Sequence, residues 1–232
     1  MNIGVFAYNF PHWKTQEGIN NLILNGFTPK LILAANPVKL NFYQSKIRIS
    51  PKDLYLTHPK IIAKTHGIDY KVVIHNSEET NKIVKEYNLD LGIILGSRIL
   101  KPIAFENFKI GVLNMHPGIL PINRGLDNIK WAVINNHPQG VTTHLIDKNI
   151  DKGKLIDKQN IKIYQDDTLM DFHIRVQNLE QKMMIEALHS IPKIKKYSPL
   201  SDGNYYKSVP IEIEYKFDYY LNRYKDKYND EI

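Results

Sequence analysis

Short apolar runs alternate with stretches of helical periodicity in the N-terminal half of this chain. The apolar runs have the length of β-strands and cover residues 3–7, 31–35, 72–75 and 91–95. Helical patterns lie between them, as at Ile19, Leu22 and Ile23, which share one face of a helix. Strands that alternate with helices in this way favour right-handed crossovers and a parallel sheet. The pattern predicts an α/β fold with a doubly wound, mostly parallel, Rossmann-like sheet.

The C-terminal part of the chain has a different character. A long amphipathic helix is predicted over residues 165–191, and Pro192 ends it. Beyond it the sequence becomes rich in Tyr and Lys, and Pro210–Tyr215 alternates in the manner of a strand. We therefore predict a main domain over residues 1–197 and a small β-rich extension over 198–232, an appendage with a helix and a β-hairpin.

The composition excludes several classes of chemistry. The chain has 232 residues and no cysteine, which removes thiolate nucleophiles, disulfides and cysteine-based zinc sites. The first residues show neither the basic region nor the cleavage site of a signal peptide, and no apolar run approaches the ~18 residues of a membrane span. We therefore expect a soluble, cytoplasmic protein without a metal. The net charge of +7 fits either nucleic acid or small anionic ligands.

Ligands of a doubly wound sheet bind beyond the carboxyl ends of its strands. The loops that follow the predicted strands are therefore the places where chemistry is expected. The first of these loops, Tyr8-Asn9-Phe10-Pro11-His12, contains neither a G-x-G-x-x-G pattern nor a phosphate-binding lysine motif. A dinucleotide or a nucleoside triphosphate in the usual phosphate cradle is not expected.

Three polar residues between positions 111 and 156 suit acyl transfer without a covalent intermediate. Asn114 and His116 follow an apolar run and, two positions apart in an extended segment, point to the same side. An Asn amide can donate to a developing oxyanion, and a His can carry protons between nitrogens. A carboxylate nearby, such as Asp151, would orient the histidine. The same residues also fit a structural histidine and a simple turn at 151–153.

A set of motifs around these residues resembles the formyltetrahydrofolate-dependent formyltransferases. The motifs, in order, are Asn114-x-His116, Leu120-Pro121, Gly125, Gly140-x-Thr142-x-His144 and Asp151-x-Gly153. The resemblance implies that Asn114, His116 and Asp151 are the catalytic residues and that N10-formyltetrahydrofolate is the formyl donor. It also implies two loops that bind the folate, formed by Ser97, Arg98, Ile99 and Leu100 and by Ile146, Asp147 and Ile150. His144 is expected in a strand that faces the site.

The resemblance is closest to the branch that formylates nucleotide-linked amino sugars. The loop after the first strand lacks the glycines of the purine-pathway enzymes, and the roughly 35 residues after Ser198 are too few for the barrel domain expected of an initiator-tRNA enzyme. The predicted substrate is dTDP-4-amino-4,6-dideoxyglucose, or a 3-amino isomer, for lipopolysaccharide O-antigen synthesis. Residues expected to bind it are Tyr8, Asn9, Phe10, Arg124 and Lys130, with His12 and Lys14 as further cations and Trp131 as a further aromatic.

Two alternatives stay open. One is a methionyl-tRNA formyltransferase-like enzyme, and the other is a basic, non-catalytic RNA-binding protein, which the net charge and the Tyr- and Lys-rich tail would suit. The favoured hypothesis expects a small-molecule nucleotide sugar as the partner, with no nucleic acid and no membrane. A homodimer is expected, with pairing through the tail.

Overall fold

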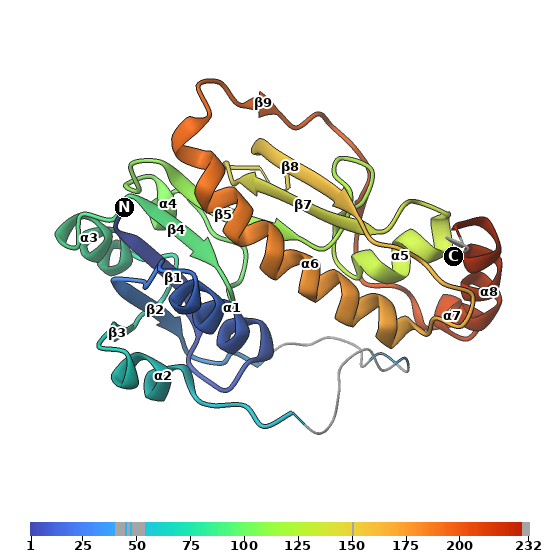
Figure 1. The fold of residues 1–232 in the computed structure, drawn as a ribbon, viewed down its shortest axis with the longest axis horizontal. Helices are drawn as coiled ribbons and strands as arrows, with labels where there is room; N and C mark the ends of the chain where they lie inside the picture. The colour runs from blue at the N-terminus through green and yellow to red at the C-terminus, as the bar shows by residue number, and fades with distance from the viewer. Residues whose placement is uncertain (40–44, 46, 48–53, 150, 229–232) are drawn as a thin grey trace. The chain divides into compact units, whose positions relative to one another are not determined.

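The computed structural model describes residues 1–39, 45, 47, 54–149 and 151–228, which form two compact units (Figure 1). The first unit contains the described residues of 1–40, 53–114 and 145–148. The second contains those of 41–52, 115–144 and 149–232. Each unit has its own internal contacts and is described by itself.

The first unit is built around a parallel sheet with the strand order β3-β2-β1-β4-β5. Its strands are β1 (Ile3–Tyr8), β2 (Leu31–Ala35), β3 (Asp69–Val72), β4 (Leu91–Ile94) and the first part of β5 (Gly111–His116). Its helices are α1 (Trp13–Leu24), α2 (Pro59–Thr65), α3 (Glu78–Glu86) and α4 (Pro102–Phe105). The predicted α/β class with a mostly parallel sheet is confirmed.

Strands β1, β2 and β4 are almost wholly buried, as expected where helices cover both faces, while the edge strand β3 is polar and partly exposed. Val5 and Phe6 of β1 are fully buried. Phe6 joins a hydrophobic cluster with Leu33 of β2, Ile83 of α3 and Phe108. This packing fixes the strand ends, where the loops with polar residues begin.

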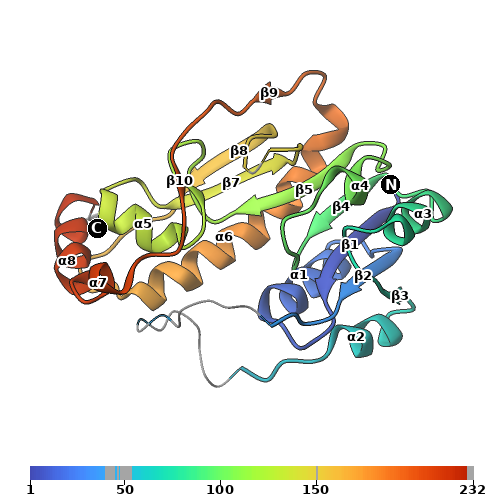
Figure 2. The same cartoon turned by 180° about the vertical axis from the view of Figure 1, so that it is seen from behind.

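The second unit combines short strands with the longest helix of the described chain. Its elements are the end of β5, β6 (Arg124–Gly125), α5 (Asn128–Asn135), β7 (Gly140–Leu145), β8 (Lys154–Asn160), α6 (Leu169–Ser190), a 3₁₀ turn η1 (Ile191–Lys193), β9 (Ser198–Pro199), β10 (Tyr205–Tyr206), α7 (Ile211–Glu214) and α8 (Phe217–Tyr228). Strand β9 pairs with β8 in antiparallel orientation, and β10 pairs with β6 in parallel. Helices α7 and α8 lie beside α5 (Figures 1 and 2).

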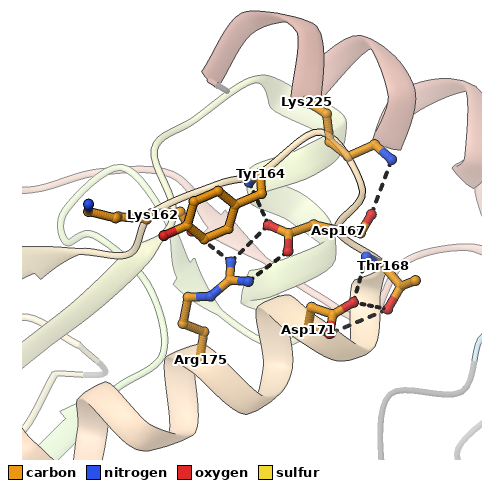
Figure 3. Close-up of polar contacts among 7 residues, drawn as sticks. All are labelled: Lys162, Tyr164, Asp167, Thr168, Asp171, Arg175 and Lys225. Atoms are coloured by element: carbon orange, nitrogen blue, oxygen red, sulfur yellow. Dashed lines mark hydrogen bonds and ion pairs between the residues drawn. The ribbon is translucent and has the colours of Figure 1, made fainter. Parts of the chain in front are cut away.

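The start of α6 is fixed by polar contacts around Asp167 (Figure 3). The guanidinium of Arg175 binds both carboxylate oxygens of Asp167, at 2.8 and 2.6 Å. Thr168 caps the helix and exchanges hydrogen bonds with Asp171, which forms a capping box. Lys225 of α8 donates to the carbonyl oxygen of Asp167 at 3.1 Å, so the same turn also anchors the C-terminal helix.

The structure corrects two of the predicted elements. The third strand lies at Asp69–Val72 rather than at 72–75, since its pairing with β2 ends at Val72. The strand predicted over Pro210–Tyr215 is wrong, because Ile211–Glu214 form a helical turn that buries Glu214. The long helix predicted over 165–191 is confirmed, and it begins at Leu169.

The boundary at residue 198 between a main domain and an extension stays a prediction. Residues 198–228 belong to the same compact unit as residues 115–144. None of the helices in the described parts of the chain combines the length and the apolar character that a membrane crossing requires.

Candidate active site

His116 and Asp151 lie together in the second unit. The Nδ1 atom of His116 is 3.4 Å from Oδ1 of Asp151, and its Nε2 atom is 2.8 Å from the carbonyl oxygen of Asn123. The His116 side chain is 4% exposed. Because a carbonyl oxygen can only accept, Nε2 donates to Asn123 and Nδ1 faces the carboxylate. The arrangement places the imidazole between a carboxylate and a backbone carbonyl.

Asp151 sits at a sharp turn, with a left-handed φ of 53°. Its Oδ2 atom accepts a hydrogen bond of 3.0 Å from the backbone N–H of Gly125. Burial acts to raise the pKa of Asp151, but hydrogen bonds from His116 and Gly125 and the charges of His116 and His144 outweigh it and lower the pKa. Asp151 is therefore an ionised partner for His116 at neutral pH.

The lowered pKa of Asp151 predicts a specific dependence of stability on pH. Because the pKa of Asp151 is lower in the folded than in the unfolded chain, the ionised carboxylate stabilises the folded state. This stabilisation is complete above the ordinary pKa of about 4. It is lost as the pH falls through the lowered pKa. We expect Asp151→Asn to be less stable than the wild type at neutral pH, and the difference to shrink at acidic pH. Urea unfolding over a pH series measures it, with the exposed Asp157→Asn as the control. A difference that stays the same at every pH would contradict the prediction.

Asn114 lies on β5, two positions before His116, and is half-buried. Residues two apart on an extended strand point to the same side. The strand thus carries an amide and an imidazole two positions apart, in the register that the sequence predicts. Asn114 is the last residue of β5 in the first unit.

The loop after β4 contains the first group of predicted folate-binding residues. The Tyr8 hydroxyl donates to the carbonyl oxygen of Ser97 at 2.8 Å. The amide of Asn76 donates to the carbonyl oxygen of Ile99 at 2.9 Å, and its oxygen accepts from the N–H of Lys101 at 2.7 Å. Asn76 thus holds this loop by its backbone. Asn76 was not among the predicted site residues. In the sequence, only its position directly after the third apolar run marks it.

The second predicted folate-binding segment lies in the same unit. Ile146 packs against the hydrophobic cluster that contains Leu100, and its N–H donates to the carbonyl oxygen of Val112 at 2.9 Å. The structure therefore brings one residue of each predicted loop to one cluster. Asp147 follows in this segment, while Ile150 lies outside the described residues.

A cavity of about 630 Å³ opens at the carboxyl ends of β1, β2 and β3 in the first unit. The residues that line it include Tyr8, Phe10, Pro37, Val38, Val72, Ile74, His75, Asn76 and Arg98. The rings of Tyr8 and Phe10 stack, with centroids 4.9 Å apart and planes inclined by 9°. Two of the residues predicted to bind substrate therefore share one largely apolar cavity with Arg98.

Asn9 holds the walls beside these aromatic rings. Its amide nitrogen donates to Oδ1 of Asn36 at 2.7 Å, and its oxygen accepts from the Tyr70 hydroxyl at 2.6 Å. His12 does not supply the positive charge expected of it, because burial and the charge of Lys14 lower its pKa to about 4. At neutral pH His12 is an uncharged ring that contacts Tyr8 edge-on.

Arg124 and Lys130 lie in the second unit and bind its C-terminal segment. Lys130 is 2% exposed, and its Nζ atom lies 2.8 Å from both Oε1 of Glu214 and Oγ of Ser45. The guanidinium of Arg124 donates to the carbonyl oxygen of Gly203 at 3.1 Å. Both cations therefore serve contacts within the second unit.

Trp131, the further aromatic candidate, also contacts the C-terminal segment. Its indole N–H donates to the carbonyl oxygen of Lys207 at 2.6 Å, and its ring stacks on Tyr206 with centroids 5.0 Å apart. Within residues 1–39, 45, 47, 54–149 and 151–228, no three His, Asp or Glu side chains form a group that could hold a metal ion.

Comparison with known proteins identifies one family, and the similar proteins within it have names that indicate different formyl acceptors. Residues 30–188, more than half of the chain, match the family described as Formyl transferase. A methionyl-tRNA formyltransferase from Chlorobium chlorochromatii is 27% identical over 134 residues, which are 55% of this chain and 43% of that protein. The chain thus spans less than half of the length of the curated relatives it matches.

Two solved structures show how widely the fold is shared. Glycinamide ribonucleotide transformylase 1 from Symbiobacterium toebii has a TM-score of 0.64 at 18% identity, over 87% of this chain and 94% of that chain. A sugar N-formyltransferase from a Shewanella species has a TM-score of 0.61 at 20% identity, over 89% of this chain and 76% of that chain. At these identities the similarity concerns the fold.

Proposed function

Because the chain belongs to the formyl transferase family, we propose that it moves a formyl group from N10-formyltetrahydrofolate to the amino group of a dTDP-linked amino-dideoxy sugar. The preferred acceptor is dTDP-4-amino-4,6-dideoxyglucose. The role of the product in O-antigen synthesis and a homodimeric state are parts of the same proposal.

The residues of the predicted folate loop fit such a donor. Ile99 exposes 61% of its surface, and Arg98 beside it is exposed. The loop therefore offers an apolar surface for a flat ring and a positive charge for carboxylates. N10-formyltetrahydrofolate supplies the formyl carbon when it is bound.

The catalytic roles follow from the groups on β5 and at the Asp151 turn. The amine nitrogen forms a bond to the formyl carbon, and the bond from that carbon to N10 breaks with its electron pair left on N10. Asn114 donates to the carbonyl oxygen while negative charge develops on it. His116, which lies beside Asp151 and contacts the Asn123 carbonyl, takes up the proton that the amine loses and gives a proton to N10.

The cavity in the first unit is the observation that favours a small nucleotide-linked acceptor. Its volume of about 630 Å³ falls in the range typical of small-molecule sites. The stacked Tyr8 and Phe10 rings offer a face for a planar base. A nucleic acid would instead need a continuous basic surface.

The second candidate is formyl transfer to methionyl-tRNA. The observation that favours it is the sequence similarity to methionyl-tRNA formyltransferases. A net charge of +7 is compatible with it. Both candidates share the formyl donor and the catalytic residues and differ only in the acceptor.

A panel of acceptors separates the candidates. The protein is incubated with N10-formyltetrahydrofolate and, in turn, dTDP-4-amino-4,6-dideoxyglucose, its 3-amino isomer, glycinamide ribonucleotide and methionyl-tRNA, and formylated products are detected by mass spectrometry. We expect transfer to a dTDP-amino sugar. Transfer only to methionyl-tRNA or glycinamide ribonucleotide, or no transfer, would overturn the proposal.

A variant pair tests the cavity in the same assay. Phe10→Ala removes one ring of the stacked pair and is expected to raise the KM for the dTDP-sugar by about 2- to 12-fold, the value of an aromatic contact. Tyr55→Ala is the matched control, since Tyr55 is 97% exposed. Equal KM values for the two variants would place the acceptor elsewhere.

A further inference from the structure

Residues 198–209, called the strap from here on, run across the second unit and contact two loops. The first is the loop that carries Asp151. Lys152 forms an ion pair with Asp202, and the N–H of Leu200 donates to the carbonyl oxygen of Gly153 at 3.0 Å. Pairing of β9 with the start of β8 continues this contact. One end of the strap is thus attached directly after the catalytic carboxylate.

The other end of the strap is attached to the loop that follows His116. The N–H groups of Arg124 and Leu126 donate to the carbonyl oxygens of Asn204 and Tyr206, at 3.2 and 2.9 Å. The N–H of Val209 donates to Oδ2 of Asp127 at 2.9 Å. The same carboxylate makes no capping hydrogen bond to α5, so its contact with the strap is its main polar role within the described residues.

The alternation of an extended strand links the strap to the catalytic pair. Successive N–H groups of a strand point in opposite directions. Since the N–H groups of Arg124 and Leu126 face the strap, the N–H of Gly125 between them faces away from it, toward Oδ2 of Asp151. The preceding carbonyl, of Asn123, is the acceptor at 2.8 Å for His116. The strand that the strap holds therefore supplies one hydrogen bond to each member of the pair.

Two glycines show how close this contact is. A Cβ at Gly125, which has a φ of 101°, would collide with the carbonyl oxygen of Tyr206. A Cβ at Gly203 would collide with the carbonyl oxygen of Pro121. Neither position accepts a side chain without moving the strap or the loop that it holds.

From these contacts we propose that the strap is a positioning element of the active site, which holds the Asn123 carbonyl and the Gly125 N–H at the places where they orient His116 and Asp151. This inference rests on the proposed function for its effect on catalysis. The effect on the geometry of the His116 ring stands apart from that function and is measured separately.

The test uses Gly203→Ala in the full chain, with Lys196→Ala as the control because Lys196 is exposed and lies outside the strap. We expect Gly203→Ala to lower kcat by about 10- to 100-fold, since a small misplacement of catalytic groups has effects of this size, while KM changes less. Nitrogen NMR of the His116 ring is expected to show changed ring-nitrogen shifts in Gly203→Ala and wild-type shifts in Lys196→Ala.

A second pair of variants keeps the inference testable if Gly203→Ala fails to fold. Asp127→Ala removes the acceptor of the Val209 N–H, and Asp127→Asn keeps an acceptor oxygen and is expected to restore kcat and the ring signals. Wild-type ring signals in both Gly203→Ala and Asp127→Ala would overturn the inference. If the wild type transfers no formyl group to any acceptor, the proposed function fails, and the ring signals still decide the role of the strap.

Discussion

Replacement of His116 by alanine is expected to lower kcat for formyl transfer by about 10²- to 10⁴-fold, the usual contribution of a group that transfers protons in the transition state. The imidazole is buried between Asp151 and the Asn123 carbonyl, and both contacts disappear with it. The affinity for the dTDP-sugar is expected to stay near that of the wild type. Steady-state kinetics and calorimetric binding measure the two quantities.

The control for this experiment is His66→Ala, which removes an exposed histidine at the end of α2. Its kcat is expected to match the wild type. Circular dichroism establishes that both variants are folded. A folded His116→Ala variant with wild-type kcat would show that the histidine is a structural residue.

Replacement of Glu214 by alanine is expected to have the largest effect on stability, about 3–5 kcal/mol. The side chains of Lys130 and Glu214 are 2% and 1% exposed, and their charged atoms are 2.8 Å apart. Removal of the carboxylate leaves a buried ammonium whose charged partner is lost. For a chain of this length the loss corresponds to a fall in Tm of about 6–20 °C. Differential scanning calorimetry measures it.

Two comparisons separate this effect from the mere loss of an ion pair. Lys82→Ala breaks an exposed pair with Glu86 on α3 and is expected to change stability by at most about 0.5 kcal/mol. Combining Lys130→Met with Glu214→Leu removes both buried charges and is expected to recover most of the stability. If Glu214→Ala is as mild as Lys82→Ala, the buried pair does not hold α7 against α5.

The first unit was predictable because its signals are local. Apolar runs of strand length and helical periodicity depend on neighbouring residues, and the parallel sheet follows from their order. The third strand was predicted three residues too late. Its position depends on pairing with β2, and the apolar run at 72–75 does not indicate where that pairing begins. The turn at Ile211–Glu214 has the alternation of a strand, but the burial of Glu214 beside Lys130 selects a helix.

The candidate site was predictable only where a motif marks it. His116 and Asp151 come together as their motif implies. The partners of Arg124 and Lys130 lie 79 and 84 residues away, so nothing near either cation indicates that it binds the C-terminal segment. Asn76 and Gly203 act on the backbone of distant loops, and such a role leaves no pattern in residue type.

The distance along the chain between Lys130 and Glu214 has a consequence for biosynthesis. Glu214 is made 84 residues after Lys130, and ribosomes add about 5–20 residues per second, which gives a delay of about 4–17 seconds. By the later part of that interval the nascent chain contains His116 and Asp151 but not yet Glu214. The contacts of Lys130 with Glu214 can therefore form only after residue 214 has been synthesised.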